Sequence, residues 1–172
     1  MRFLIFTLLA FTLFSCKKKL TEFYIDYTSE AIIPATVPIA SPFNIWTPEQ
    51  TTNSEFEFEV NNTNKERIRS IILEKLNITI TSPTNQNFGF LKDVDIYISA
   101  EGLGEELLAF KHNIPESAGK ELICEVTKKD VQAYIKQDVF KVKLKTVTRE
   151  LITNDVKVAI YTNFLVDAQL LK

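Results

Sequence analysis

Three glutamates at alternate positions, Glu55, Glu57 and Glu59, could in principle hold a metal ion. Calcium binds oxygens that lie roughly 2.3–2.6 Å from one centre. The residues between and after them are apolar, and this alternation predicts a half-buried strand: Phe56, Phe58 and Val60. Alternate strand residues lie about 7 Å apart along one face, so a straight strand cannot bring three carboxylates to one ion. We therefore expect a solvated acidic face and no metal site.

A row of lysines could face these glutamates. Lys141, Lys143 and Lys145 alternate with apolar residues, which predicts a second strand with one basic face. Opposite charges on neighbouring strands stabilise their pairing, each pair by a fraction of a kilocalorie. The sequence therefore predicts that the glutamate row and the lysine row pair across two strands.

His112 is the only histidine in the chain. A catalytic histidine needs a nucleophile or a carboxylate within reach, and a metal site needs several ligands. Ser117 is close in sequence, but the residues around it do not form a nucleophile elbow. We expect His112 to be a surface or strand-end residue.

Glu101, Glu105 and Glu106 flank two glycines and could form a pair of glycosidase carboxylates. Such a pair needs a separation of about 5–10 Å, which nothing in this segment fixes. We interpret the segment as a charged turn.

Trp46 is the strongest binding candidate in the sequence, with Phe43 three residues before it in the segment Pro42–Pro48. An exposed tryptophan between prolines could stack on a sugar or anchor a protein partner. The alternative is that Trp46 plugs one end of the fold. The two interpretations differ in the exposure of the indole, which is buried if Trp46 is a plug and exposed if it is a binding residue.

Composition excludes several classes of function. The formal net charge of −2 argues against nucleic-acid binding, which requires a clustered basic surface. Four glycines make a glycine-rich phosphate cradle improbable in this chain, and we expect no cofactor. If Cys16 is acylated, Cys124 is left without a disulfide partner, and its apolar surroundings predict an inert buried thiol.

Alternating apolar residues recur at short spacing, which predicts about eight strands. They begin near residues 21, 54, 72, 94, 108, 122, 140 and 156. In the third of these, Ile72 is expected on the same face as Leu76. Four prolines mark Ile32–Gln50 as an edge or surface segment: Pro34, Pro38, Pro42 and Pro48.

One helix is expected after the sixth strand. Thr127 could cap it, with Asp130 in an imperfect capping box, and the apolar stripe would be Val131, Tyr134 and Ile135. Few helices and many strands predict an all-β antiparallel sandwich, immunoglobulin-like or like that of water-stress proteins, with one or two short helices.

The N-terminus carries a secretion pattern. Met1-Arg2 is followed by an apolar run of about a dozen residues, which is too short to span a membrane, and then by a small residue. The sequence Leu13-Phe14-Ser15-Cys16 resembles a bacterial lipoprotein signal. This resemblance implies that Cys16 becomes the lipidated first residue of the mature chain. We expect a signal peptide at 1–15, a short tether at 16–19 and one sandwich domain at 20–172.

The stretches Leu76–Pro83 and Phe88–Ala100 resemble envelope lipoproteins of unknown function from the Bacteroidota. The resemblance extends loosely over most of the mature chain and contains no catalytic motif. It implies an outer-membrane lipoprotein. Lysines follow Cys16 in place of the acidic run that this group associates with surface export, so we expect the protein to face the periplasm.

These features favour a non-enzymatic protein that is held at the membrane by its lipid. It would act as a binding, adaptor or structural module for another envelope protein. Two alternatives stay open. The sandwich could carry a hydrophobic small molecule or lipid, in which case it would enclose a continuous apolar cavity. A hydrolase would need a cleft that brings His112 together with a serine and a carboxylate.

Overall fold

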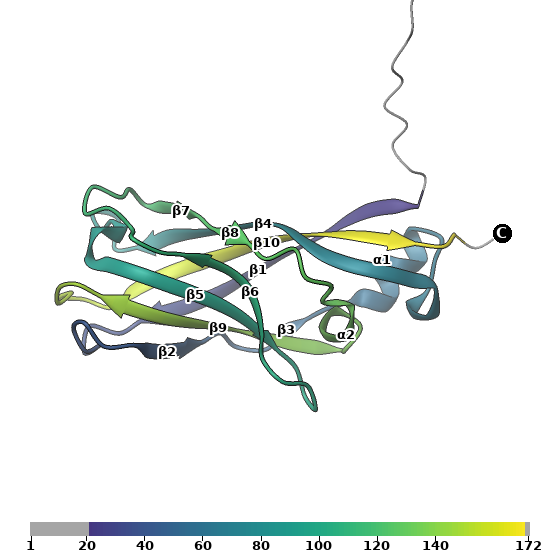
Figure 1. Ribbon diagram of the computed structural model, residues 1–172, viewed down its shortest axis with the longest axis horizontal. Helices are drawn as coiled ribbons and strands as arrows, with labels where there is room; N and C mark the ends of the chain where they lie inside the picture. The colour runs from purple at the N-terminus through teal and green to yellow at the C-terminus, as the bar shows by residue number, and fades with distance from the viewer. Residues whose placement is uncertain (1–20, 171–172) are drawn as a thin grey trace, which may run out of the picture.

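The computed structural model describes residues 21–170, and it is an antiparallel sandwich of two packed sheets (Figure 1). The four-stranded sheet has the order β1 (Glu22–Ile33), β10 (Val156–Ala168), β4 (Ile68–Ser82) and β7 (Glu121–Ile123). The six-stranded sheet has the order β2 (Phe43–Trp46), β9 (Val139–Thr148), β5 (Leu91–Ser99), β6 (Glu106–Lys111) and β8 (Glu125–Val126), and β3 (Gln50–Thr51) also pairs with β9. The predicted all-β sandwich is confirmed.

The core lies between the two sheets, and strict alternation in the long strands builds it. In β10, Val156, Val158, Ile160 and each second residue after them are buried, because successive strand residues point to opposite faces. Tyr27 of β1 enters this core, where its ring lies 5.2 Å from that of Phe140 in an edge-on contact. Its hydroxyl donates a hydrogen bond of 2.7 Å to the Thr52 carbonyl. Burial, and then the charge of Glu57, raises the pKa of Tyr27.

In β4, the residues that point into the core differ from those that the sequence pattern predicts. The structure buries Leu73 and Leu76, and Ile72 is only half-buried. The cause is a β-bulge: Asn163 of β10 faces Lys75 and its neighbour Phe164 faces Leu73, so Glu74 is an extra residue. The extra residue reverses which face each side chain occupies, and the prediction for Ile72 was wrong for this reason.

Ile32–Gln50 lies at the sheet edge, as its prolines predict. Its first two residues, Ile32 and Ile33, are the last residues of β1. β2 is the outermost strand of the six-stranded sheet and pairs only with β9. Between the two strands, Ile39 forms a single parallel bridge with Thr148.

The predicted strand at Ser54–Val60 is wrong, because this segment is the helix α1. Asn53 adopts a left-handed backbone conformation with φ of 48°, and its carbonyl accepts the first helical hydrogen bond from the Glu57 amide at 3.0 Å. In a helix, 3.6 residues make a turn, so residues two apart point in nearly opposite directions. Phe58 therefore reaches the core with no exposed surface, whereas Phe56 is 63% exposed.

The second helix, α2 (Gln132–Ile135), is shorter than expected, and Thr127 does not cap it. The Thr127 hydroxyl instead donates to the carbonyls of Leu107 and Leu108 at the margin of the six-stranded sheet. Asp130 lies at the start of α2 and accepts hydrogen bonds from the amides of Gln132 and Ile71, which joins the helix to β4. Two single-turn 3-10 helices complete the fold, at Lys65–Arg67 and Phe88–Phe90.

Between residues 21 and 170, no helix is long and apolar enough to cross a membrane. Cys16, the expected signal at 1–15 and the expected tether at 16–19 lie outside the described residues.

Candidate functional site

Trp46 ends β2 on the outer face of the six-stranded sheet, where 46% of it is exposed. The strand register places three neighbours in one row with it: Trp46 opposite Lys143, Lys143 opposite Tyr97, and Tyr97 opposite Leu107. Directly opposed residues of neighbouring strands share a face and touch. The expectation that Trp46 plugs the fold is therefore wrong, and the indole is available at the surface.

Lys143 contacts both aromatic residues of this row. Its ammonium lies 4.4 Å from the centre of the Tyr97 ring and 5.6 Å from the centre of the Trp46 ring. A cation at such distances is attracted to the electron-rich ring faces. The same ammonium forms an ion pair with Glu105, and only 8% of Lys143 is exposed. Trp46 thus lies beside a lysine whose ammonium also contacts Tyr97 of β5 and Glu105 in the loop before β6.

The next row on this face is polar. Lys145 lies opposite both Asn44 and Asp95, and Asp95 lies 2.7 Å from the His112 Nε2 atom. The His112 ring lies 5.0 Å from the Phe110 ring at the end of β6. The outer face thus combines an exposed aromatic plane with amide, carboxylate and ammonium groups. Such a combination can bind a ligand that has one apolar face and several hydrogen-bonding groups.

Phe43, the second predicted binding residue, is not part of this surface. Residues two apart in a strand share a face, and Phe43 lies on the same side of β2 as the buried Ile45. It is half-buried and packs against the core. The structure therefore places Phe43 and Trp46, the two residues that the sequence suggested for binding, on opposite faces of β2.

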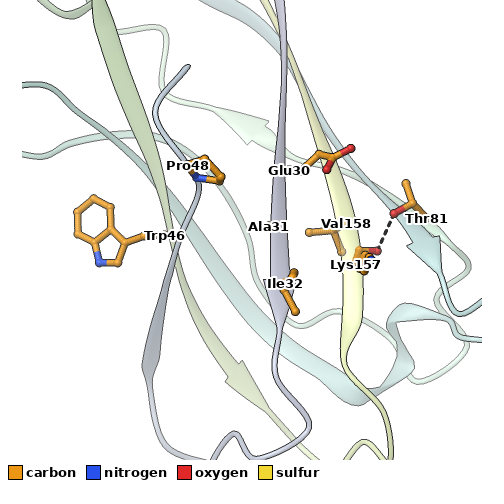
Figure 2. A pocket seen from close by; sticks show the side chains of 8 residues that line it. All are labelled: Glu30, Ala31, Ile32, Trp46, Pro48, Thr81, Lys157 and Val158. Carbon is orange, nitrogen blue, oxygen red and sulfur yellow. Dashed lines mark hydrogen bonds between the residues drawn. The ribbon is translucent and has the colours of Figure 1, made fainter. Parts of the chain in front are cut away.

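A cavity of about 350 Å³ opens between β1 and the β2–β3 connection. Figure 2 shows Ile32, Val158 and Pro48 around it, with the Trp46 side chain directed away from Ile32 and Val158. The cavity lies at the edge of the sandwich. Large aromatic side chains fill the centre, each at most 1% exposed: Phe58, Phe88, Phe90, Phe140 and Phe164.

The predicted pairing of the glutamate and lysine rows was wrong, because the glutamates lie on a helix. Glu55 pairs with Lys65 at 3.1 Å. Lys141 pairs instead with Glu49 at 3.1 Å, and Lys143 with Glu105.

The remaining candidates do not converge. Glu105 and Glu106 pair with different lysines, Lys143 and Lys129, and Glu101 is exposed in the turn before them. In the part of the chain that the structure describes, no group of three or more His, Cys, Asp or Glu residues could hold a metal ion. Cys124 is buried as a free thiol, and burial raises its pKa to about 12, which keeps it protonated and unreactive at neutral pH.

Sequence reasoning did not find Tyr97 or the ring contacts of Lys143. Lys143 was predicted in a strand with a basic face, and Tyr97 falls in the strand expected from about residue 94, but their contact depends on β9 lying between β2 and β5. Strand order of this kind is a long-range property that alternation does not encode.

No family model and no curated protein matches this chain. Among solved structures, a chain from Desmodium yellow mottle tymovirus is 12% identical, with a TM-score of 0.33, over 88% of this chain and 90% of that one. A chain from the empty head of turnip yellow mosaic virus is 15% identical, with a TM-score of 0.30, over 87% of this chain and 83% of that one. These likenesses are too low to carry an argument about function.

Proposed function

We propose that this chain is a non-enzymatic binding module of the bacterial cell envelope, held by a lipid on Cys16 at the periplasmic side of the outer membrane. Its ligand face is the outer face of the six-stranded sheet around Trp46, and its ligand is another envelope component. The anchor is supported by the Leu13-Phe14-Ser15-Cys16 signal and the lysines that follow it. One or two further acyl chains would make attachment stable, because a single chain binds only marginally.

The observation that carries the binding role is the state of Trp46. An indole that is 46% exposed on a sheet face exposes apolar surface to water. Lys143 holds it in place through a contact that spans two neighbouring strands. A rigid aromatic group loses little conformational entropy when a ligand covers it, which is why tryptophan is enriched at binding hot spots.

The test compares Trp46→Ala with Tyr161→Ala, each in the full lipidated chain purified gently from its own membrane. Tyr161 is the matched control, because it is also an exposed aromatic residue (36%) but lies on the outer face of the other sheet. We expect the component that co-purifies with the wild type to be lost from W46A and retained by Y161A. If both variants retained the co-purifying component equally, Trp46 would not be part of the binding face.

The anchor is tested separately by the mass of the peptide that contains Cys16 and by Cys16→Ser. Acylation should add the mass of the lipid, and C16S should release the protein from washed membranes. An unmodified Cys16 in a secreted chain would contradict lipid anchoring.

A carrier of a small molecule is the second candidate, and the observation that favours it is the pocket beside Ile32, which is open at the edge of the sandwich and is also lined by Glu30 and Lys157. Its volume of about 350 Å³ suits a small molecule, since ligand sites span roughly 300–1,000 Å³. Native mass spectrometry would show a small adduct that survives removal of detergent. Ile32→Trp should abolish that adduct by filling the cavity.

A further inference from the structure

If Cys16 carries the proposed lipid, a short tether would hold one end of the sandwich close to the membrane. Cys16 precedes Glu22, the first residue of β1, by six positions, which at full extension span about 20 Å. At this end Glu22 lies opposite Asp167 of β10. Figure 1 shows the start of β1, the end of β10 and α1 together at one end, and the loop between β9 and β10 at the other.

The helix α1 is fixed to this end by its buried aromatic residue. Phe58 has no exposed surface, and its ring lies 6.4 Å from that of Phe23, near the start of β1, in an edge-on contact. The backbone after α1 is tied to the end of β10 as well, because the Thr63 hydroxyl donates to the Gln169 carbonyl at 3.0 Å. The position of α1 relative to the start of β1 and the end of β10 is therefore set by the fold.

The opposite face of α1 exposes two apolar side chains. Phe56 is 63% exposed and Val60 is 55% exposed. Residues four apart in a helix lie on one face, so these two side chains form a single apolar patch. The patch is a consequence of the alternating sequence: a strand would have placed Phe56, Phe58 and Val60 on one buried face, and the helix turns two of them outward.

We propose that Phe56 and Val60 enter the interfacial region of the bilayer to which Cys16 is attached, so that α1 sets the orientation of the sandwich at the membrane. This inference rests on the lipid anchor of the proposed function. An amphipathic helix binds an interface by burying its apolar face at the boundary of headgroups and acyl chains. The anchor supplies proximity, so a patch of two side chains is enough to select one orientation.

The charges of α1 bear on the kind of surface. Glu55 is paired with Lys65, but Glu57 and Glu59 also lie on this short helix. Glu57 and Glu59 are repelled by an anionic leaflet, so α1 itself favours a zwitterionic surface, whereas the lysines after Cys16 favour an anionic one. In this orientation the loop between β9 and β10 lies at the end of the sandwich that is farthest from the bilayer. The thirteen residues of β10 span about 40 Å.

The test uses the full lipidated chain in phosphatidylcholine vesicles whose acyl chains carry bromine, which quenches tryptophan on contact. Trp46 is the only tryptophan, so a Trp46→Phe background allows a reporter to be placed elsewhere. One variant adds F56W. The matched control adds L151W, which also replaces an exposed apolar residue (65%) but in the loop between β9 and β10.

We expect F56W emission to fall several-fold more than L151W emission in brominated vesicles, and neither to fall in vesicles without bromine. Equal quenching of the two reporters, with Cys16 acylated and the protein still on the vesicles, would overturn the inference and leave the anchor intact. F56W could also be protected from a water-soluble quencher and yet not be quenched by the brominated lipid. That result would overturn the inference as well, because a protein and not the bilayer would then cover the patch. An unmodified Cys16 would remove the anchor and this inference together.

Discussion

The Lys143 ammonium lies over the ring of Tyr97, 4.4 Å from its centre, whereas Lys141 and Lys145 of the same strand are exposed. Its second aromatic neighbour is Trp46 and its counterion is Glu105. Three weak attractions act on one charge that is mostly removed from solvent. Lys143 therefore links the edge strand β2 to the centre of the six-stranded sheet.

Lys143→Met keeps the apolar stem of the side chain and removes the charge. We expect it to lower the free energy of unfolding by about 1–2 kcal/mol, because two cation–π contacts and a partly buried ion pair are lost. Denaturant unfolding measures the change. Lys145→Met on the same strand is the control, since Lys145 is exposed and has no ion-pair partner among residues 21–170. It should change stability by less than about 0.5 kcal/mol. Equal effects would show that the ring contacts contribute nothing.

Phe58→Ala and Phe56→Ala test the helix at Ser54–Val60. Phe58 has no exposed surface, so F58A should cost about 3–5 kcal/mol through lost burial and a residual cavity. Phe56 is 63% exposed, and F56A should change stability by less than about 0.5 kcal/mol in solution. A strand would place both side chains on one face, so similar losses in chemical unfolding would contradict the helix.

Gly89→Ala should destabilise the fold because the position has no room for a side chain. A Cβ atom at Gly89 would lie 2.2 Å from the carbonyl oxygen of Glu116, so the backbone must shift. Forced overpacking of this kind costs about 1–3 kcal/mol. Gly104→Ala is the matched control, since a Cβ there would meet no atom within 4 Å. If thermal unfolding showed the same midpoint for both variants, the close approach at Gly89 would be disproved.

The buried thiol predicts how stability changes at alkaline pH. Burial raises the pKa of Cys124 from 9.0 to about 12, so the folded state keeps a proton that the unfolded state releases above pH 9. Stability is therefore full below pH 9 and falls as the pH rises from about 9 to about 12. Cys124→Ala removes this contribution and should flatten that part of the unfolding curve. Tyr27, whose pKa is also raised by burial, still lowers stability in the variant, but only above its ordinary pKa of 10.0. An unchanged slope between pH 9 and 10 in C124A would contradict the assignment.

The predictions that succeeded rest on local pattern. Strict alternation in β1 and β10 reports burial on one face, and this is enough to predict an antiparallel sandwich. The prediction at Ser54–Val60 failed because alternating apolar residues can form either a half-buried strand or a short helix in which Phe58 is the one buried apolar residue. In the structure this segment connects β3 to β4 as a helix, and the apolar alternation alone does not distinguish that helix from a strand.

Two other features depend on structure that a linear pattern does not contain. One extra residue at Glu74 reverses the faces of β4, and nothing in the apolar pattern marks its position. The contact of Lys143 with Trp46 and Tyr97 requires the strand order β2-β9-β5. The residues of the candidate site were therefore visible in the sequence as single positions, but their association was not.

The place of β1 at the border of its sheet has a consequence for solubility. A bare strand edge invites a second copy to add to it, which is the first step toward aggregates. On its outward face β1 carries an acid at every fourth position: Glu22, Asp26 and Glu30. Two copies joined antiparallel about Asp26 would set Asp26 against Asp26 and each Glu22 against a Glu30. Repulsion between like carboxylates therefore disfavours the addition of a second copy at this edge.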